Sequence, residues 1–220
     1  MMERHSERPH AARMDNKYAK TRHVYDLTRR YFLFGRDQAL RVLEPQSAPS
    51  ILEIGCGTGR NLRLLARMAP WASLYGVDIS GEMLKTAGAA LGEYPNVRLA
   101  AADASSFDGE GVFGRGTFDR VLVSYAISMI PDRQAALARA IASLAPGGRL
   151  VIVDFGSFLG FGPLRHLAAR LLAWADAPPV RDLPSEVSAA LPAAGYDLFH
   201  RSGPAAYYTL VTVERRDGQR

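Results

Sequence analysis

Short apolar runs alternate with amphipathic stretches along most of this chain. Apolar runs typical of buried strands lie at 51–55, 73–79, 97–103, 118–127 and 149–155. The stretches between them that are expected to be helical lie at 60–68, 81–91 and 132–144. Because parallel strands join through right-handed helical crossovers, this order predicts a doubly wound α/β fold with a mostly parallel, buried sheet.

The pattern changes toward the carboxyl end. After Gly195, segments 196–202 and 206–216 have the composition of two strands joined by a Gly-Pro turn. We expect them to form a hairpin that adds an antiparallel edge, which brings the sheet to seven strands.

The amino-terminal part has a different organisation. Residues 1–16 are polar, lack the apolar run of a secretory signal and are expected to be disordered. Residues 17–43 are expected to be helical with a break near Gly35, and a Pro/Ser-rich linker follows. The predicted units are a disordered basic tail (1–16), a helical lid (17–49) and one α/β domain (50–220).

Charge is distributed unevenly along the chain. The first 41 residues hold ten Lys or Arg and five Asp or Glu, and the remainder is neutral, so this arm carries the whole formal net charge of +5. A basic arm suits an anionic membrane surface or nucleic acid, and a solvated tail explains it equally well. No run of apolar residues is long enough for a transmembrane helix. The single cysteine, Cys56, excludes an internal disulfide and fits a reducing compartment.

A glycine-rich loop follows the first predicted strand. In LEIGCGTGRN (52–61), Gly55, Gly57 and Gly59 permit a tight turn and a close approach of the backbone to a ligand. The helix that follows offers free N–H groups to it. The third glycine of a dinucleotide fingerprint would fall at Arg60 or Leu62, so a pyrophosphate-binding loop is disfavoured, and no Walker lysine motif occurs.

Acidic residues end the next two predicted strands. Asp78 ends the second strand, where a carboxylate is placed to accept hydrogen bonds from both hydroxyls of a ribose. Asp103 ends the third strand, at the same edge of the sheet. Either acid alone is explained as a helix cap, but two of them beside a glycine loop favour a ligand site.

This combination resembles the class I S-adenosylmethionine-dependent methyltransferases, which have a Rossmann-like fold. The resemblance covers about residues 50–215 and rests on LEIGCGTG, YGVDISGEMLKTA, AAADASSF, FDRVLVSYAI and LAPGGRLVIVDF. It implies that S-adenosyl-L-methionine is the cofactor and that S-adenosyl-L-homocysteine is the product.

The resemblance also implies positions for the cofactor. Glu53 would orient the loop, the three glycines would line the methionine moiety, and Asp78 would hold the ribose. The remaining cofactor contacts would come from residues beside the adenine and the sulfonium: Ile79, Met83, Asp103 and Ala104 at the adenine, and Ser124 near the sulfonium. Met83 has a second explanation, because its helical spacing with Leu84 and Ala87 is also that of a core residue.

A narrower resemblance includes the segment before the glycine loop. RHVYDLTRRYFLFGRD (22–37), VSYAISMIPD and VIVDFG are similar to bacterial N-methyltransferases of betaine-lipid synthesis, which convert diacylglyceryl-homoserine to its trimethyl form. Phosphatidylethanolamine N-methyltransferases of the soluble bacterial type are close neighbours of that group. This resemblance implies a lipid amine acceptor and a cytoplasmic enzyme peripherally associated with the anionic inner membrane, with no nucleic-acid partner.

The composition of the predicted lid suits such an acceptor. Each basic residue close to an anionic bilayer contributes about 1 kcal/mol of attraction, and phenylalanines can enter the interface. Tyrosine rings attract a quaternary ammonium by about 0.5–2 kcal/mol each, and Tyr18 and Tyr25 are the candidates for that contact, whereas Tyr31 is expected to pack on the sheet. Arg36 is a candidate partner for the carboxylate of the cofactor or of homoserine, and a surface role is an equal alternative.

The expected chemistry is direct attack of the acceptor nitrogen on the sulfonium methyl, in which the protein supplies positioning and desolvation. No metal-ligand cluster occurs at suitable spacing. The general base is open between His23, Tyr125 and bulk water. Alternative functions are methylation of phosphatidylethanolamine, a quinone or a soluble small molecule, or a non-enzymatic module that binds membranes or nucleic acid.

A second candidate membrane element lies at 157–179. Phe158 and Phe161 are expected to line an acyl-chain entrance or to lie on the membrane interface. Leu167 and Leu171 of the same segment are expected to be core residues.

Overall fold

The computed structural model describes residues 33–165, 170, 172, 179–180 and 182–218. The predictions for the basic tail and for Tyr18, His23, Tyr25 and Tyr31 lie outside the described residues, as do those for Leu167 and Leu171.

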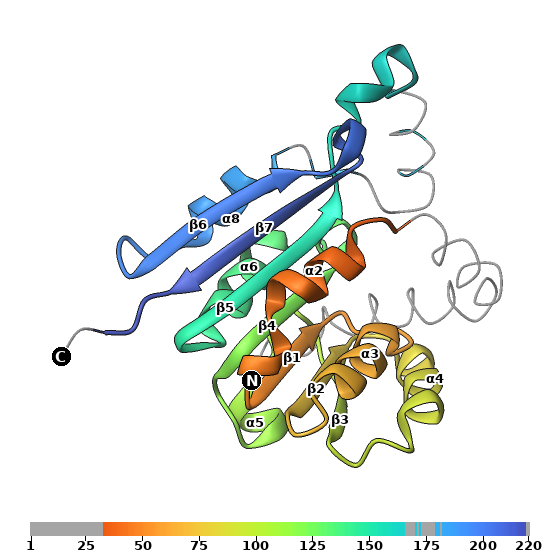
Figure 1. Ribbon diagram of the computed structural model, residues 1–220, viewed down its shortest axis with the longest axis vertical. Helices are drawn as coiled ribbons and strands as arrows, with labels where there is room; N and C mark the ends of the chain where they lie inside the picture. Colours follow the sequence, from red (N-terminus) through yellow and green to blue (C-terminus); the bar gives the residue numbers. More distant parts are fainter. Residues whose placement is uncertain (1–32, 166–169, 171, 173–178, 181, 219–220) are drawn as a thin grey trace, which may run out of the picture.

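A seven-stranded sheet with the order β3-β2-β1-β4-β5-β7-β6 forms the centre of the domain (Figure 1). The first five strands pair in parallel, and β7 is antiparallel to both β5 and β6. The strands are β1 (Ser50–Ile54), β2 (Ser73–Asp78), β3 (Val97–Ala101), β4 (Phe118–Ser124), β5 (Leu144–Phe155), β6 (Tyr196–Ser202) and β7 (Tyr208–Arg215). The predicted Rossmann-like fold and its antiparallel carboxyl-terminal hairpin are therefore confirmed.

Helices cover both faces of this sheet and divide the core in two. One apolar cluster lies between the sheet and the helices α2 (Arg36–Leu43), α3 (Arg60–Met68) and α4 (Gly81–Leu91). The other lies under α5 (Gly109–Phe113), α6 (Arg133–Ala142) and α8 (Leu183–Ala190). Short 3₁₀ turns complete the described elements: η1 (Pro45–Ser47), η2 (Ile127–Met129), η3 (Leu159–Leu164) and η4 (Pro204–Ala206). None of the helices in the described part is long and apolar enough to cross a bilayer.

Two predicted strands differ from the observed ones by three or more residues at one end, and the others differ by two or fewer at either end. The fourth strand ends at Ser124, because η2 begins only three residues later. The fifth strand begins at Leu144 rather than at 149, and its pairing with β4 passes from Leu144 opposite Phe118 to Arg149 opposite Arg120. Residues 145–148 therefore bulge out of the ladder, and Gly147 adopts the positive φ of 69° that this detour needs.

Helix α2 begins where the sequence predicted a break. Gly35, at φ 84°, is its N-cap, and the helix runs from Arg36 to Leu43 over β4 and β5. A side chain on Gly35 would clash with the ring of Tyr208, since its Cβ would lie 2.7 Å from Cε2 of that ring. Glycine is thus required at this position both for conformation and for packing.

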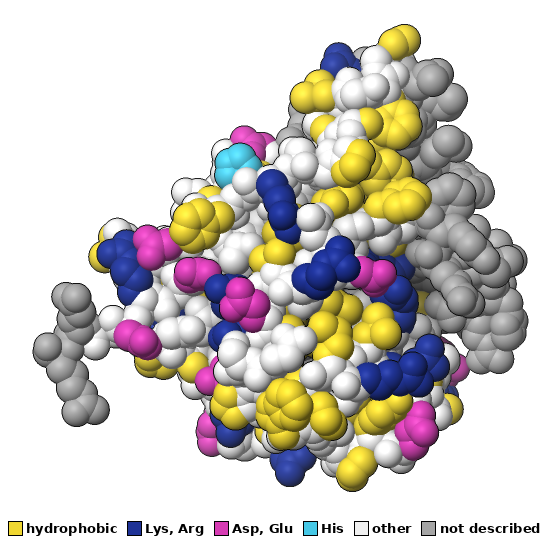
Figure 2. Space-filling model, viewed as in Figure 1, with side chains coloured by type: hydrophobic (Ala, Val, Ile, Leu, Met, Phe, Trp, Pro, Cys, Tyr) yellow, Lys and Arg dark blue, Asp and Glu magenta, His cyan; other side chains and the backbone are white. Residues whose placement is uncertain are grey.

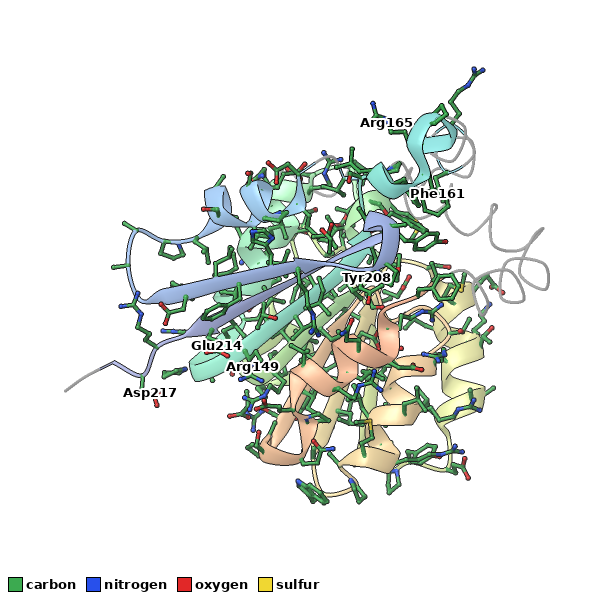
Figure 3. The ribbon with its side chains drawn as sticks, turned by 45° about the horizontal axis from the view of Figure 1, so that its top comes forward. Arg149, Phe161, Arg165, Tyr208, Glu214 and Asp217 are labelled. Atoms are coloured by element: carbon green, nitrogen blue, oxygen red, sulfur yellow. The ribbon has the colours of Figure 1, made fainter. Side chains whose placement is uncertain are left out.

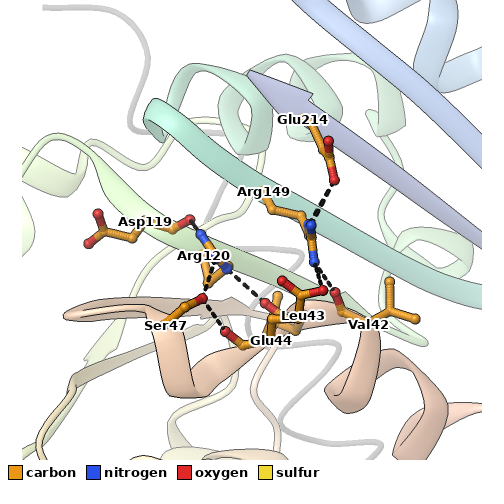
Figure 4. Close-up of polar contacts among 8 residues, drawn as sticks. All are labelled: Val42, Leu43, Glu44, Ser47, Asp119, Arg120, Arg149 and Glu214. Carbon is orange, nitrogen blue, oxygen red and sulfur yellow. Dashed lines mark hydrogen bonds and ion pairs between the residues drawn. The ribbon is translucent and has the colours of Figure 1, made fainter. Parts of the chain in front are cut away.

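Two arginines fasten the other end of α2 to the sheet (Figure 4). The Nε of Arg120 donates to the carbonyl oxygen of Leu43, and the Nη1 of Arg149 donates to that of Val42, both at 2.7 Å. These are among the last carbonyls of the helix, which have no partner within it. Because this end is held, the amino-terminal end of α2 is placed beside the carboxyl edge of the sheet.

Candidate functional site

A cavity of about 460 Å³ lies at the glycine loop, beside the carboxyl ends of β1 and β4. Its walls come from the end of β1, the glycine loop, the start of α2 and the residues before it, α3, α4 and the last residue of β4. The lining residues are Leu33, Arg36, Glu53, Gly55, Cys56, Gly57, Thr58, Arg60, Asn61, Arg63, Leu64, Met83 and Ser124. Ligands bind at this edge in open α/β sheets.

All three glycines of the loop have left-handed backbone conformations. The φ angles are 72° at Gly55, 54° at Gly57 and 76° at Gly59, which is the N-cap of α3. A Cβ on Gly55 would lie 2.5 Å from that of Ala126, whereas a Cβ on Gly57 would meet nothing within 4 Å. The first glycine therefore permits close packing behind the loop, and Gly57 leaves open space at the cavity wall.

Asp78 joins the glycine loop to the end of β2. Its Oδ2 accepts a hydrogen bond from the backbone N–H of Gly57 at 2.8 Å, and its Oδ1 accepts one from Ser80 at 2.9 Å. Each carboxylate oxygen has a second lone pair for a further donor. Asp78 therefore orders the loop in addition to its predicted role at the ribose.

Glu53 is a fully buried acid in the cavity wall. Its Oε1 accepts from the Nδ2 of Asn61 at 2.7 Å, whereas its Oε2 has no hydrogen-bond partner among the described residues. Burial raises the pKa of Glu53 to about 8, although the Asn61 bond and the charges of Arg36 and Arg60 oppose that rise. A cationic group in the cavity would satisfy this carboxyl and favour its ionised form.

Ser124 and Tyr125 end β4 next to the cavity. The Oγ of Ser124 is buried without a hydrogen-bond partner in the described part of the chain. The hydroxyl of Tyr125 donates to the carbonyl oxygen of Phe34 at 2.5 Å, and burial raises the pKa of Tyr125 well above its usual value. A phenol that holds its proton so firmly is a poor general base at neutral pH.

Of the remaining residues predicted to contact the cofactor, only Met83 lines this cavity. Met83 is buried and also lines the cavity, which is compatible with both of its interpretations. Ile79, Asp103 and Ala104 are half-buried at the β2 and β3 edge, beyond the walls of this cavity. The Oδ1 of Asp103 accepts from both the N–H and the hydroxyl of Ser105, so this acid also caps the turn after β3. Their adenine roles stay predictions.

Cys56 lines the cavity, but its thiol is expected to be unreactive. Burial raises the pKa of its thiol well above the ordinary value, and nearby Asp78 and Glu53 raise it further. No group of His, Cys, Asp and Glu in the described residues is arranged to hold a metal ion.

Sequence reasoning missed an aromatic cluster beside the cavity. It consists of Phe34, Phe155, Phe158, Phe161 and Tyr207, and the ring of Tyr207 meets those of Phe34 and Phe158 edge-on at 5.3 and 5.2 Å. These residues come from segments far apart in the chain, so no local sequence motif predicts the cluster. Phe158 is only 2% exposed, so its predicted place on a membrane interface is wrong, whereas Phe161 is 39% exposed.

Comparisons with known proteins agree on the fold. Residues 51–148 match the family model described as Methyltransferase domain. The YcgJ protein from Bacillus subtilis has 17% identity and a TM-score of 0.63, over 83% of this chain and 98% of that one. The phosphoethanolamine N-methyltransferase 2 of Haemonchus contortus, solved with S-adenosyl-L-methionine, has 17% identity and a TM-score of 0.65, over 83% of this chain and 53% of that one.

Curated relatives are more similar in sequence, but each match covers only part of their length. The demethylmenaquinone methyltransferase of Thermus thermophilus is 35% identical over 137 residues, which are 60% of each chain. The trans-aconitate 2-methyltransferase of Deinococcus radiodurans is 34% identical over 102 residues, 46% of this chain and 36% of that one. The chain thus spans about 60% of the length of the first relatives that it matches.

The cavity fits S-adenosyl-L-methionine. The Oε2 of Glu53 and the Oγ of Ser124, which have no hydrogen-bond partner among the described residues, provide acceptors in its walls, and Gly57 leaves room for a ligand at the loop. The sheet order and the glycine loop agree with the match of residues 51–148 to the methyltransferase domain family, so this part of the chain is similar to S-adenosylmethionine-dependent methyltransferases.

Proposed function

We propose that the chain transfers methyl groups from S-adenosyl-L-methionine to a lipid headgroup amine, with diacylglyceryl-homoserine and its trimethyl betaine lipid as the first candidates. The observation that carries the proposal is the position of the aromatic cluster next to Ser124 of the cofactor cavity. Tyr125 links the two, because it follows Ser124, packs its ring on Phe155 at 4.8 Å and donates to the backbone of Phe34.

The aromatic cluster suits an amine that becomes a quaternary ammonium. Phe34 and Phe161 are exposed, and the ring of Tyr207 packs against both of them. Aromatic faces attract an ammonium that has no N–H left to donate. The same exposed rings offer apolar contact to the tails of a lipid.

Different residues of the cavity would bind different groups of the cofactor. When bound, S-adenosyl-L-methionine supplies an electrophilic methyl group on a sulfonium. Glu53 provides an anionic acceptor for a cationic amino group, and Arg36 provides a guanidinium for a carboxylate. Asp78 fixes the loop and is the candidate acceptor for the ribose hydroxyls. Since Tyr125 keeps its proton, water or His23 takes the proton that the acceptor amine must lose before it attacks.

A quinone C-methyltransferase is the second candidate. It is favoured by relatives that carry that name, such as the ubiquinone/menaquinone biosynthesis C-methyltransferase of Geotalea daltonii, 31% identical over 155 residues. A quinone also has an apolar tail that would fit the aromatic cluster. The two candidates differ in the acceptor's reacting atom, which is nitrogen in one and carbon in the other.

A direct assay distinguishes these candidates. The purified chain is incubated with methyl-labelled cofactor and, separately, with diacylglyceryl-homoserine, phosphatidylethanolamine and demethylmenaquinone in neutral detergent, and products are identified by mass spectrometry. We expect mono-, di- and trimethylated lipid amine. Labelled menaquinone with unmodified lipid amines would instead establish the second candidate.

The proposed lid is tested in the same assay. Tyr25→Phe keeps the aromatic face and is expected to retain part of the activity, whereas Tyr25→Ala is expected to lose most of the trimethylated product, because the later acceptors rely on ring faces. Trimethylation at the wild-type rate by folded Tyr25→Ala would reject the aromatic lid.

A further inference from the structure

A second cavity, of about 400 Å³, adjoins the first at the amino-terminal end of α2. It shares Leu33, Arg36 and Arg60 with the cofactor cavity. Its other walls come from α2, the residues before it and the start of β7: Phe34, Gly35, Asp37, Gln38, Arg41 and Tyr208.

This second cavity is strongly basic. Arg36, Arg41 and Arg60 face one acid, Asp37, which already pairs with Arg60 at 3.1 Å. No acid among the described residues forms an ion pair with Arg41. When its amide nitrogen faces Tyr208, Gln38 accepts from the Arg201 guanidinium at 3.1 Å, which brings another cation to the rim. Arg41 thus adds a positive charge to this cavity that no acid of the described residues pairs.

The floor of the second cavity is the ring of Tyr208. This ring lies against two glycines, since a Cβ on Gly35 would approach it to 2.7 Å and a Cβ on Gly203 to 2.2 Å. Its hydroxyl lies 2.5 Å from the side-chain amide of Gln38. Figure 3 shows Tyr208 and Phe161 toward one end of the sheet, and Arg149 and Glu214 toward the other. The floor is therefore fixed from both sides at the end where the cofactor cavity lies.

An apolar surface begins at the rim of the second cavity. Phe34 lines the cavity and packs edge-on against Tyr207 of the aromatic cluster, and Phe34, Leu159 and Phe161 are 57%, 62% and 39% exposed. In Figure 2, hydrophobic side chains gather at upper right, where η3 stands in Figure 1, and Lys or Arg side chains lie below them over α2. A basic pocket beside an apolar surface is complementary to an amphiphile with an anionic head.

We propose that the second cavity binds the anionic group of the acceptor lipid, a phosphate or a carboxylate, while the apolar chain lies on the aromatic cluster. Arg41 is the residue that tests this proposal, because it lines the second cavity and not the first. A guanidinium binds either anion through paired hydrogen bonds. The identity of the amphiphile as the acceptor rests on the function proposed above. The pocket would orient a zwitterionic lipid amine, and it would have no use for the uncharged head of a quinone.

Binding of simple amphiphiles tests the pocket without any methyl transfer. The chain is saturated with S-adenosyl-L-homocysteine, so that the first cavity is filled, and is titrated by calorimetry with dodecyl phosphate, dodecanoate and dodecyl maltoside below their micelle concentrations. These probes share one tail and differ in the head. The variants are Arg41→Gln, Arg41→Lys and a matched control, Arg139→Gln, which removes an exposed arginine on α6 at the opposite face of the sheet.

We expect Arg41→Gln to weaken binding of the anionic probes at least tenfold, Arg41→Lys to weaken it less, and Arg139→Gln to leave it within twofold. Affinity for the maltoside and for S-adenosyl-L-homocysteine should be the same in all four proteins. The stronger of the two anionic probes identifies phosphate or carboxylate as the preferred head. Equal binding of dodecyl phosphate by wild type and Arg41→Gln, or maltoside bound as tightly as dodecyl phosphate, would overturn the proposal.

The outcome is separable from that of the methylation assay. If Arg41→Gln loses dodecyl phosphate binding while no lipid amine is methylated, the anionic pocket stands and the proposed function fails. If lipid amines are methylated while Arg41→Gln binds dodecyl phosphate normally, the function stands and the pocket is rejected.

Discussion

The carboxylate of Asp78 accepts a hydrogen bond from the backbone N–H of Gly57 at 2.8 Å, and this bond connects the end of β2 to the glycine loop. The two residues are 21 positions apart and belong to neighbouring parallel strands and their following loops. The acid that the sequence assigned to the ribose thus also sets the shape of the loop that is expected to line the methionine end. One residue couples both halves of the expected cofactor site.

Replacement of Asp78 by alanine tests this coupling. Asp78→Ala removes charge-assisted hydrogen bonds, so affinity for S-adenosyl-L-homocysteine should fall by at least about 2 kcal/mol, or about thirtyfold. The matched control is Asp108→Ala, which also removes an acid that accepts two backbone N–H groups, at the start of α5. That variant should lose about 1 kcal/mol of stability and no affinity. Unchanged calorimetric affinity in folded Asp78→Ala would contradict the assignment.

Gly57 offers a test of the open space at the loop. Gly57→Ala places a methyl group at the cavity wall and a side chain at φ 54°, and the left-handed conformation costs about 1–2 kcal/mol. Gly114→Ala is the matched control, because Gly114 has φ 68° and open surroundings but lies at the end of α5.

The two glycine variants should lose similar stability in chemical denaturation. Only Gly57→Ala should also weaken binding of S-adenosyl-L-homocysteine, by at least tenfold, because its methyl group occupies ligand space. Equal affinities in the two variants would show that the space at Gly57 is not used by the cofactor.

The sequence predicted most of the sheet because strand and helix signals here are local. Helices 60–68 and 81–91 were located to the residue, since a left-handed glycine precedes one and a serine that accepts from the N–H of Met83 caps the other. The bulge at residues 145–148 was missed because a Pro-Gly-Gly turn has the same composition whether it precedes a strand or interrupts one. The strand continues on both sides of residues 145–148 because it pairs with β4 there, and this tertiary pairing is not visible in the local sequence pattern.

The site was predicted less completely for the same physical reason. The glycine loop and Asp78 lie at the ends of two successive predicted strands, so local sequence patterns locate them. The aromatic cluster instead brings together Phe34, Phe158 and Tyr207 from three distant segments. The second cavity likewise depends on Tyr208 packing against Gly35, which is 173 residues earlier in the chain. Contacts of this kind follow from the order of strands in the sheet, and only the structure reveals them.

Tyr125 is expected to act through structure rather than as a base. Tyr125→Phe keeps the ring on Phe155 but leaves the carbonyl of Phe34 without its donor, so stability should fall by about 0.5–1.5 kcal/mol. The pH profile of methyl transfer should keep its shape, because a phenol with a strongly raised pKa does not ionise in the working range. Tyr196→Phe on β6 is the control for loss of a hydroxyl away from the cavity. A hundredfold loss of turnover in folded Tyr125→Phe, with a flattened pH profile, would instead support a base.

Glu53 is expected to make stability depend on pH. Its pKa is about 8 in the native state and near the ordinary 4.5 in the unfolded chain, so between these values the native state binds more protons. This contribution to stability is therefore fully present below about pH 4.5 and is lost as pH rises to about 8. Glu53→Gln keeps an acceptor for Asn61 and does not titrate, so the loss should disappear.

The measurement is denaturant unfolding of the cofactor-free chain at several pH values between 5 and 8. Over that range the free energy of unfolding of wild type, relative to Glu53→Gln, should fall by at least about 2 kcal/mol, since each unit of pKa difference corresponds to about 1.4 kcal/mol. Glu93→Gln, at an exposed position, controls for the loss of one negative charge. Parallel curves for wild type and Glu53→Gln would mean that Glu53 ionises freely in the native state. The carboxyl would then already be solvated or paired, and a cationic group of the cofactor would gain little from it.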